Sequence, residues 1–405
     1  MATRRIDAAE RRARLGRRHG LAGPAARFPD ATTAAAALVG LHATDPATVF
    51  LAARARVTDF RVDALETALY DTQELIKHLG MRRTLFVLPQ RDLHLVQAAV
   101  SDDLLAAQRR RLIKEVEAAG VARPNGGARW LAAAEEATVA ALERLGPVPG
   151  ATLSRHVPEL QAKIGYAPGK KWGGEVGVAN RVYTILALAG RIRRGPPGGW
   201  TSSRHTWEPI AGPTGTVTDA ATARTELIRR WLEAFGPATV ADIAWWTGLG
   251  LTKVRAALAR LDTVAVDLDG EPGVVLADDV DPPPDGANAN ANAGAEPSWV
   301  AALPALDPPA MGWKGRRFYL DPAHVPVLFD RSGNVGATLW VDGRIVGGWS
   351  QRRSGEVVHR LLTDVGAEAT AAIEDELAAL QRFLGDVVVS PRFPVPLDKE
   401  LRGDG

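Results

Sequence analysis

Few of the residues in this chain belong to the types from which enzymes most often build a reactive centre. Cysteine is absent, which excludes disulfides, thiolate nucleophiles, zinc fingers and iron–sulfur clusters. The eight histidines are scattered, and no pair has a metal-ligand spacing such as His-Glu-x-x-His. Residues 166–174 contain Gly and Lys but lack Gly-x-x-x-x-Gly-Lys-Ser/Thr, which excludes a nucleotide-hydrolysing phosphate loop. We therefore expect neither a metal nor a cofactor.

Basic side chains are concentrated in one half of the chain, where they could bind a polyanion. Residues 1–200 contain 30 Lys and Arg against 19 Asp and Glu, whereas residues 201–405 contain 19 against 28. A net charge of +11 in the first half favours a polyanionic partner such as DNA, since neutralising phosphates releases counterions. The alternative is a set of solvated helix faces. The excess lies in residues 4–18, 109–114, 170–171 and 191–194.

Length and hydropathy bound the architecture that must position these side chains. A chain of 405 residues exceeds one usual hydrophobic core and predicts two to four domains. No apolar run approaches the roughly 18 to 20 residues that span a bilayer, and the Arg-rich N-terminus has no apolar block after it. We expect a soluble, cytoplasmic monomer with no membrane partner.

A sequence pattern recurs after 90 residues and indicates a repeated unit. Glu-Arg-Leu-Gly-Pro at 143–147 and Glu-Ala-Phe-Gly-Pro at 233–237 each precede a helix-like run. After the second copy, residues 239–246 and 252–261 predict two helices, the latter with Thr252 as N-cap. A hairpin over 264–276 follows, turning at Asp269-Gly270. Helix, turn, helix and hairpin is the order of a winged helix.

Two further units fit this order more loosely. One has helices at 131–145 and 176–189 and a wing over 191–207, and the other occupies 28–90 with its wing at 79–88. Residues 281–297 are rich in Pro, Ala, Asn and Gly and predict a flexible linker.

The segment after the linker changes to strands, which predicts a small β-barrel. Strands are expected at 336–341, 345–349, 357–362 and 387–389, with a helix at 367–383. The predicted fold class is therefore α+β, with three tandem winged-helix units followed by a C-terminal β-barrel domain. The expected domains are 1–100, 101–215 and 216–280 for the three units, 281–297 for the linker and 298–405 for the barrel.

Five segments give the chain a resemblance to the winged-helix alkylpurine DNA glycosylases of the AlkZ and YcaQ type. They are Gly-Leu-His-Ala-Thr-Asp-Pro at 40–46, Leu-Ala-Ala-Arg-Ala-Arg at 51–56, Met-Arg-Arg-Thr-Leu-Phe at 81–86, Leu-Pro-Ala-Leu-Asp at 303–307 and Val-Asp-Gly-Arg-Ile-Val-Gly-Gly-Trp at 341–349. The resemblance extends over about residues 17–393. It implies three tandem winged helices and a C-terminal β-barrel, in agreement with the division above.

The resemblance also implies a catalytic site at His42, Thr44 and Asp45. The family's glycosylases carry Gln-x-Gln or Gln-x-Asp in the first unit, and His42 and Thr44 occupy the two aligned positions. These side chains are thought to hold the hydrolytic water and to stabilise positive charge on the deoxyribose. A neutral imidazole can accept a proton, Thr44 can orient the water and Asp45 can supply a carboxylate. The rate should then fall below a pKa of about 6.5.

Each of these residues also has a structural alternative. His42 can bond to backbone between two helices, and Asp45 can cap a helix that begins at Pro46. Trp245 and Trp246 are expected in the core rather than as stacking platforms. For phosphate contacts the candidates on the first unit and the basic stretches are Arg54, Arg56, Arg82, Arg83, Lys170, Lys171, Arg191 and Arg193.

The functional hypothesis is a monofunctional DNA glycosylase for DNA repair. It would hydrolyse the N-glycosidic bond of alkylated purines, either N7/N3 lesions or bulky adducts, in double-stranded DNA. No lysine lies in the motif, so a Schiff-base lyase step is not expected. The alternative hypothesis is a winged-helix DNA-binding protein without catalysis.

Overall fold

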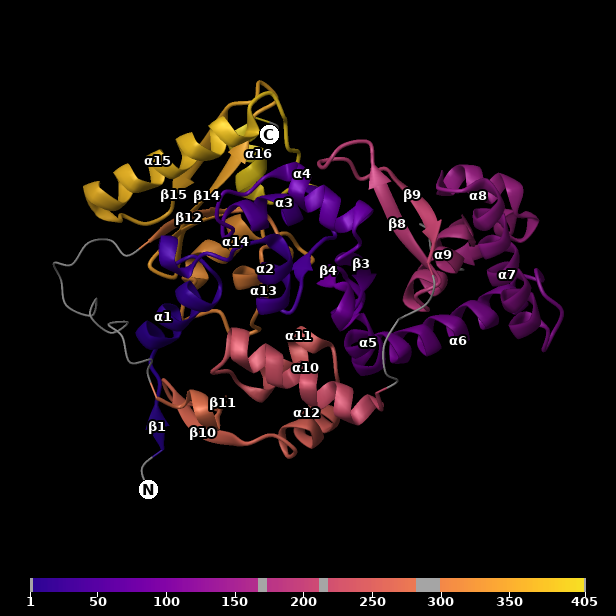
Figure 1. Cartoon of the computed structure of the whole chain (residues 1–405), viewed down its shortest axis with the longest axis horizontal. Coiled ribbons are helices and arrows are strands. Elements are labelled where there is room, and N and C mark those ends of the chain that lie inside the picture. Colours follow the sequence, from indigo (N-terminus) through magenta and orange to yellow (C-terminus); the bar gives the residue numbers. More distant parts are fainter. Residues whose placement is uncertain (1–2, 167–172, 211–217, 282–298, 404–405) are drawn as a thin grey trace.

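Three helical units, each ending in a β-hairpin, and a C-terminal sheet covered by a long helix make up the structure (Figure 1). The computed structural model describes residues 3–166, 173–210, 218–281 and 299–403. The predicted linker therefore lies outside the described residues, apart from Asp281. None of the helices in the described ranges is long and apolar enough to cross a membrane.

The first unit sandwiches its sheet between its own helices and the third unit. The three strands are antiparallel in the order β2-β4-β3, and side chains alternate between the two faces. Leu75, Leu85 and Val87 pack on the helices of the unit, whereas Phe86 and Leu88 belong to the core shared with the third unit. The elements are α2 (Ala31–Ala37), β2 (Leu41–His42), α3 (Pro46–Arg54), α4 (Val62–Glu66), β3 (Leu75–Leu79), β4 (Leu85–Pro89) and the following α5 (Leu93–Val96).

The second unit lies to one side of the others and has a separate core (Figure 1). Its buried apolar residues fall within 112–207, and its hairpin joins a third strand in the order β5-β9-β8. The long α6 connects it to the first unit. The elements are α6 (Asp102–Ala118), α7 (Gly127–Leu145), β5 (Val148–Pro149), α8 (Gly150–His156), β6 (Lys163–Tyr166), β7 (Gly174–Gly177), α9 (Ala179–Leu188), β8 (Ile192–Pro197) and β9 (His205–Pro209).

The third unit repeats the order of the second. Gly146-Pro147 and Gly236-Pro237 directly follow the long helices α7 and α10, as the repeated pattern predicts. A capping box between Thr239 and Asp242 starts α11, but Gly250 caps α12, so the prediction of Thr252 as N-cap is wrong. Thr252 lies inside the first turn of that helix. The elements are α10 (Ala220–Phe235), α11 (Val240–Thr247), α12 (Leu251–Leu258), β10 (Thr263–Leu268) and β11 (Glu271–Leu276).

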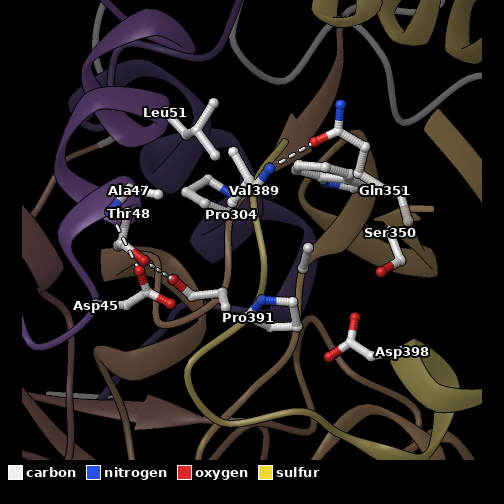
Figure 2. Close-up of a pocket in the computed structure, with 13 residues that line it drawn as sticks. Asp45, Ala47, Thr48, Leu51, Pro304, Ser350, Gln351, Val389, Pro391 and Asp398 are labelled. Atoms are coloured by element: carbon white, nitrogen blue, oxygen red, sulfur yellow. Dashed lines mark hydrogen bonds between the residues drawn. The ribbon is translucent and has the colours of Figure 1, made fainter. Parts of the chain in front are cut away.

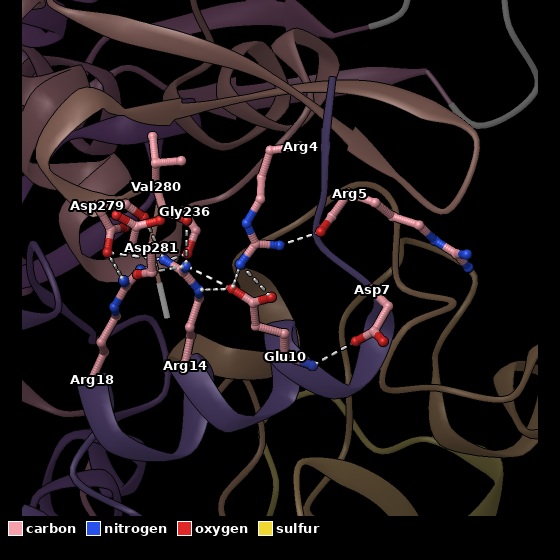
Figure 3. Close-up of polar contacts among 10 residues, drawn as sticks. All are labelled: Arg4, Arg5, Asp7, Glu10, Arg14, Arg18, Gly236, Asp279, Val280 and Asp281. Atoms are coloured by element: carbon pink, nitrogen blue, oxygen red, sulfur yellow. Dashed lines mark hydrogen bonds and ion pairs between the residues drawn. The ribbon is translucent and has the colours of Figure 1, made fainter. Parts of the chain in front are cut away.

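The N-terminal basic segment is bound to the third unit. Strand β1 (Arg4–Arg5) pairs in parallel with β10, and α1 (Ala8–Arg18) follows it. Arg14 is 1% exposed and makes ion pairs with Glu10 and Asp279, and Arg18 contacts Asp279 as well (Figure 3). Much of this basic stretch is therefore neutralised by carboxylates of the protein itself, which argues against it as the main DNA contact.

The C-terminal sheet is open, so the prediction of a β-barrel is wrong. Its four antiparallel strands have the order β12-β13-β14-β15, and in the described residues β12 and β15 do not close on each other. The predicted strand at 387–389 does not form. These residues are instead bound by the Gln351 side chain, which donates to Val387 O and accepts from Val389 N. The elements are β12 (Val300–Leu303), α13 (Pro308–Met311), α14 (Val325–Leu328), β13 (Thr338–Val341), β14 (Arg344–Gln351), β15 (Val357–Leu361), α15 (Gly366–Leu384) and α16 (Pro396–Arg402).

Two apolar clusters join parts that are distant in the sequence. One contains α1, the outer face of the first sheet, α10, α11 and residues near 299–345. The other packs Ala47 and Leu51 of α3 against Val346 of β14 and Leu377 of α15. The first unit, the third unit and the C-terminal region are thereby held together, and the strand β2 lies between them.

Candidate functional site

A polar side chain, His42, interrupts the apolar face that the first sheet turns toward the third unit, and Thr44 follows directly after this strand. His42 pairs with Phe86 across the β2–β4 ladder, and the two rings lie 5.3 Å apart. Their shared register puts both side chains on the same face, and Thr44 follows two positions later. The bond from Ala43 N to Leu85 O, at 2.8 Å, continues the pairing past His42.

One polar atom of each side chain, His42 Nδ1 and Thr44 Oγ1, has no partner among the residues that the structure describes. His42 is 4% exposed, and neither its Nδ1 nor the buried Oγ1 of Thr44 meets a hydrogen-bonding group of the described residues. The backbone contact that the structural alternative predicts for His42 is therefore not found there. A buried polar atom without a partner costs about 1–3 kcal/mol. Two of them only two positions apart in the chain mark a position that a polar ligand can occupy.

The imidazole of His42 is held in its neutral form. Burial, aided by the positive charge of Arg82, lowers the pKa of His42 to about 3. The pH below which the rate of a His42-dependent reaction falls is consequently about 3 and not the ordinary value near 6.5. A protonated imidazole would repel a developing oxocarbenium ion, and burial removes that conflict at physiological pH.

Arg82 and Arg83 occupy the turn between β3 and β4, both in the left-handed region with φ of 53° and 60°. Arg83 is exposed, whereas the guanidinium of Arg82 lies 3.9 Å from the ring centre of Trp245. Trp245 is only partly buried, but Trp246 is 4% exposed and belongs to the core, as predicted. The turn thus brings Arg82 to the same interface as His42.

Asp45 has the capping role rather than a place beside His42. Its Oδ1 accepts from Ala47 N at 3.1 Å and its Oδ2 from Arg392 N at 3.0 Å, so both oxygens hold backbone amides. Burial raises its pKa. The carboxylate faces a small pocket toward the C-terminal region, together with Asp398 (Figure 2). The expectation of a catalytic Asp45 is therefore not supported.

The pocket beside Asp45 is too small for a nucleobase. Its volume of about 30 Å³ accommodates little more than a water molecule. Asp398, on its other side, caps α16 through Val395 N, and burial raises the pKa of Asp398 to about 6.

Two of the predicted DNA contacts are internal instead. Arg56 is fully buried and donates to both oxygens of Asp307, itself fully buried, at 2.7 and 3.1 Å. Its guanidinium cannot reach a phosphate, so that prediction is wrong. Arg54 makes an ion pair of 2.6 Å with Glu376 on α15. The motifs at 51–56 and 303–307 are thus joined by a structural ion pair, which explains why both carry charged residues.

A basic pocket of about 650 Å³ lies between β3 and the hairpin β8–β9 of the second unit. Of the predicted residues it contains Arg193, which is also bound to Glu208 at 2.8 Å, whereas Arg191 lies outside it and binds Glu136 at 2.7 Å. Lys170 and Lys171 lie outside the described residues. No carboxylate lines the pocket in the described part of the chain, and its basic residues are Lys77, Arg193, Arg194, Arg204, His205 and Arg392.

The basic pocket and His42 lie on opposite faces of the first sheet. Lys77, Leu79 and Leu85 line the pocket, whereas Phe86, the next residue along β4 after Leu85, points to the other face and contacts His42. Burial lowers the pKa of Lys77 to about 8, so Lys77 is still largely charged near neutrality. Sequence reasoning missed Lys77, Arg204 and His205, although Arg204 and His205 follow the predicted wing turn and could have been assigned to the same surface.

No metal site accompanies either surface in the part of the chain that the structure describes. No group of three or more His, Asp or Glu is positioned there to bind a metal ion.

Comparison with known proteins gives one family and one fold. The model of the family described as DNA glycosylase AlkZ-like matches residues 35–383. The solved structure of Streptomyces sahachiroi DNA glycosylase AlkZ is similar with a TM-score of 0.68 at 20% identity, over 96% of this chain and 99% of that one. A search of the curated proteins finds no match. The mixed α/β architecture described above is therefore the fold of AlkZ.

Proposed function

Because the chain belongs to the AlkZ-like DNA glycosylase family, we propose that it is a monofunctional glycosylase that releases alkylated purines from duplex DNA. The observation that carries the proposal is the pair His42 and Thr44, which occupies the family's two polar positions with unpartnered polar atoms. We further propose that the three helical units are winged helices that hold the duplex. The reaction needs water and no cofactor.

The chemistry suits a lesion that departs easily. A purine alkylated at N7 or N3 carries a positive charge, so its glycosidic bond breaks with little help from an acid. The protein must place a water molecule at C1′ and stabilise the positive charge that grows on the sugar. The bond from C1′ to the purine breaks, the water oxygen bonds to C1′, and the water gives up a proton to solvent.

His42 and Thr44 are equipped for these two tasks. The neutral Nδ1 of His42 can accept a hydrogen bond from the water, and Thr44 Oγ1 can accept a second or donate to its oxygen. The lowered pKa keeps the imidazole uncharged, so it does not oppose the cationic sugar. We assign no chemical step to Asp45, since its oxygens hold Ala47 N and Arg392 N.

The basic pocket supplies contacts to the duplex away from the reacting sugar. Lys77, Arg194 and Arg204 converge there from two units without a carboxylate among the lining residues. Contacts of this kind neutralise backbone phosphates and set affinity without reading sequence. We propose that binding is steeply salt-dependent and nearly independent of sequence.

Base release from a duplex with one 7-methylguanine tests the proposal. Abasic sites are counted after alkaline cleavage for the wild type, His42→Ala, His42→Gln and the control His359→Ala, a half-buried histidine of β15. We expect His42→Ala to lose roughly 10²-fold or more in rate with nearly unchanged affinity, and His42→Gln, which has the family's residue, to remain active. Wild type that binds duplex but releases neither 7-methylguanine nor a bulky N7 adduct would leave the DNA-binding alternative.

A further inference from the structure

Two arginines from distant parts of the chain converge on one indole beside the candidate site. The guanidinium carbon of Arg82 lies 3.9 Å from the centre of the Trp245 ring, and that of Arg316 lies 5.2 Å from it. Trp245, Arg82 and Arg316 are each only partly buried. Arg82 comes from the first unit, Trp245 from α11 and Arg316 from the C-terminal region.

The positions of the two arginines are fixed by the surrounding backbone. Arg82 has a φ of 53° and is packed so closely on the end of α11 that a Cβ on Gly248 would lie 3.1 Å from Arg82 N. The loop of Arg316 is held by Gly315 N, which donates to Asp242 Oδ1 at 2.8 Å. A left-handed conformation for a residue other than Gly or Asn costs about 1 kcal/mol or more and is retained where a side chain must be aimed.

Neither cation is neutralised by the described part of the protein. No carboxylate lies within ion-pair distance of Arg82 or Arg316 there, and the Nε atoms of both are buried without a partner. Asp242, the carboxylate that holds this loop, uses its second oxygen for Thr239. Two guanidinium groups on one ring repel each other. A bound anion would remove this repulsion.

The geometry points to a phosphate site: we propose that Arg82 and Arg316, carried by Trp245, bind a backbone phosphate of the DNA strand that contains the target nucleotide. The inference rests on the proposed function, because it is DNA that brings the phosphate. Guanidinium groups suit this ligand, since each offers paired N–H donors to phosphate oxygens. Arg82 is near enough to influence the charge of His42, so this phosphate would lie close to the nucleotide presented to His42 and Thr44.

A set of duplexes with single methylphosphonates tests the contact without changing the protein. Each duplex replaces one charged phosphate near a 7-methylguanine by a neutral group, and affinity is measured by fluorescence anisotropy. We expect one position at which wild type loses affinity several-fold. The double variant Arg82→Gln/Arg316→Gln should bind that duplex as well as the unmodified one and should lower the salt slope of binding by about one, because the two arginines share one phosphate. Each single variant should lose part of this phosphate dependence. Arg382→Gln, an exposed arginine of α15, is the control.

The outcomes separate this inference from the proposed function. If wild type releases no base but the coupling between Arg82 and one phosphate is found, the glycosylase proposal fails and the phosphate site stands. The phosphate site is overturned if base release occurs but each methylphosphonate lowers the affinity of the variants as much as it lowers that of wild type. Arg316→Lys, which keeps the charge and changes the packing least, should retain the phosphate dependence, and its loss there would also count against the site.

Discussion

The rate of base release should be nearly independent of pH between about 5 and 8, in contrast to a reaction that depends on an ordinary histidine. Only the neutral imidazole of His42 can accept from the water, so the rate falls when the pH falls through its pKa. With the usual pKa of 6.5, about 3% of the side chain would be neutral at pH 5, and the rate would drop about 30-fold. With the pKa lowered to about 3, about 99% stays neutral.

Single-turnover assays with excess enzyme isolate this effect from substrate binding. Release from a 7-methylguanine duplex is measured at steps between pH 5 and 8 and constant ionic strength, with the spontaneous loss in the absence of protein subtracted. His42→Gln has no titrating group at this position and should give the same flat profile. A wild-type limb near pH 6.5 that is missing in His42→Gln would refute the argument that burial and Arg82 keep His42 neutral.

Other consequences concern stability and binding. Asp307→Ala should lower the free energy of unfolding by about 3–5 kcal/mol in urea titrations, because it leaves Arg56 buried and unpaired. The double variant Arg56→Met with Asp307→Leu should leave this free energy nearly unchanged, and an equal loss in both proteins would contradict the argument. The raised pKa of Asp398 stabilises the fold below about pH 4, and this contribution is lost as pH rises through about 6. Wild type should therefore lose about 2 kcal/mol relative to Asp398→Asn between about pH 4 and 6, and a constant difference would exclude it. Lys77→Ala with Arg204→Ala should reduce the salt slope of duplex binding by about two with unchanged single-turnover rate, and an unaltered slope would remove the basic pocket from the interface.

Local patterns were sufficient where neighbouring residues determine the structure. The turn at Asp269-Gly270 forms with both residues at positive φ, as its composition predicts, and Asp45 caps the helix that starts at Pro46. The repeat of Gly-Pro after α7 and α10 likewise follows from the sequence. The open sheet could not be predicted in this way, because closure depends on whether the edge strands β12 and β15 pair, and these lie more than 50 residues apart in the chain.

The charge asymmetry of the sequence has a second meaning that only the tertiary structure reveals. Several arginines of the basic half are paired with carboxylates of the acidic half, among them Arg14 with Asp279 and Arg56 with Asp307. A partner was therefore inferred partly from charges that neutralise each other inside the molecule. Net charge is a statement about the field around the protein and does not say which residues face a ligand.

Whether an arginine can bind DNA then depends on whether a carboxylate of the protein already neutralises it. Arg82 and Arg316 at Trp245, and Arg194 in the basic pocket, have no ion-pair partner in the described ranges, whereas Arg54 binds Glu376 on α15. An arginine already bound to a carboxylate must give up that bond before it can contact phosphate, so its net contribution to affinity is small. The first sheet separates the uncompensated arginines into two groups, one beside His42 and one on the opposite face.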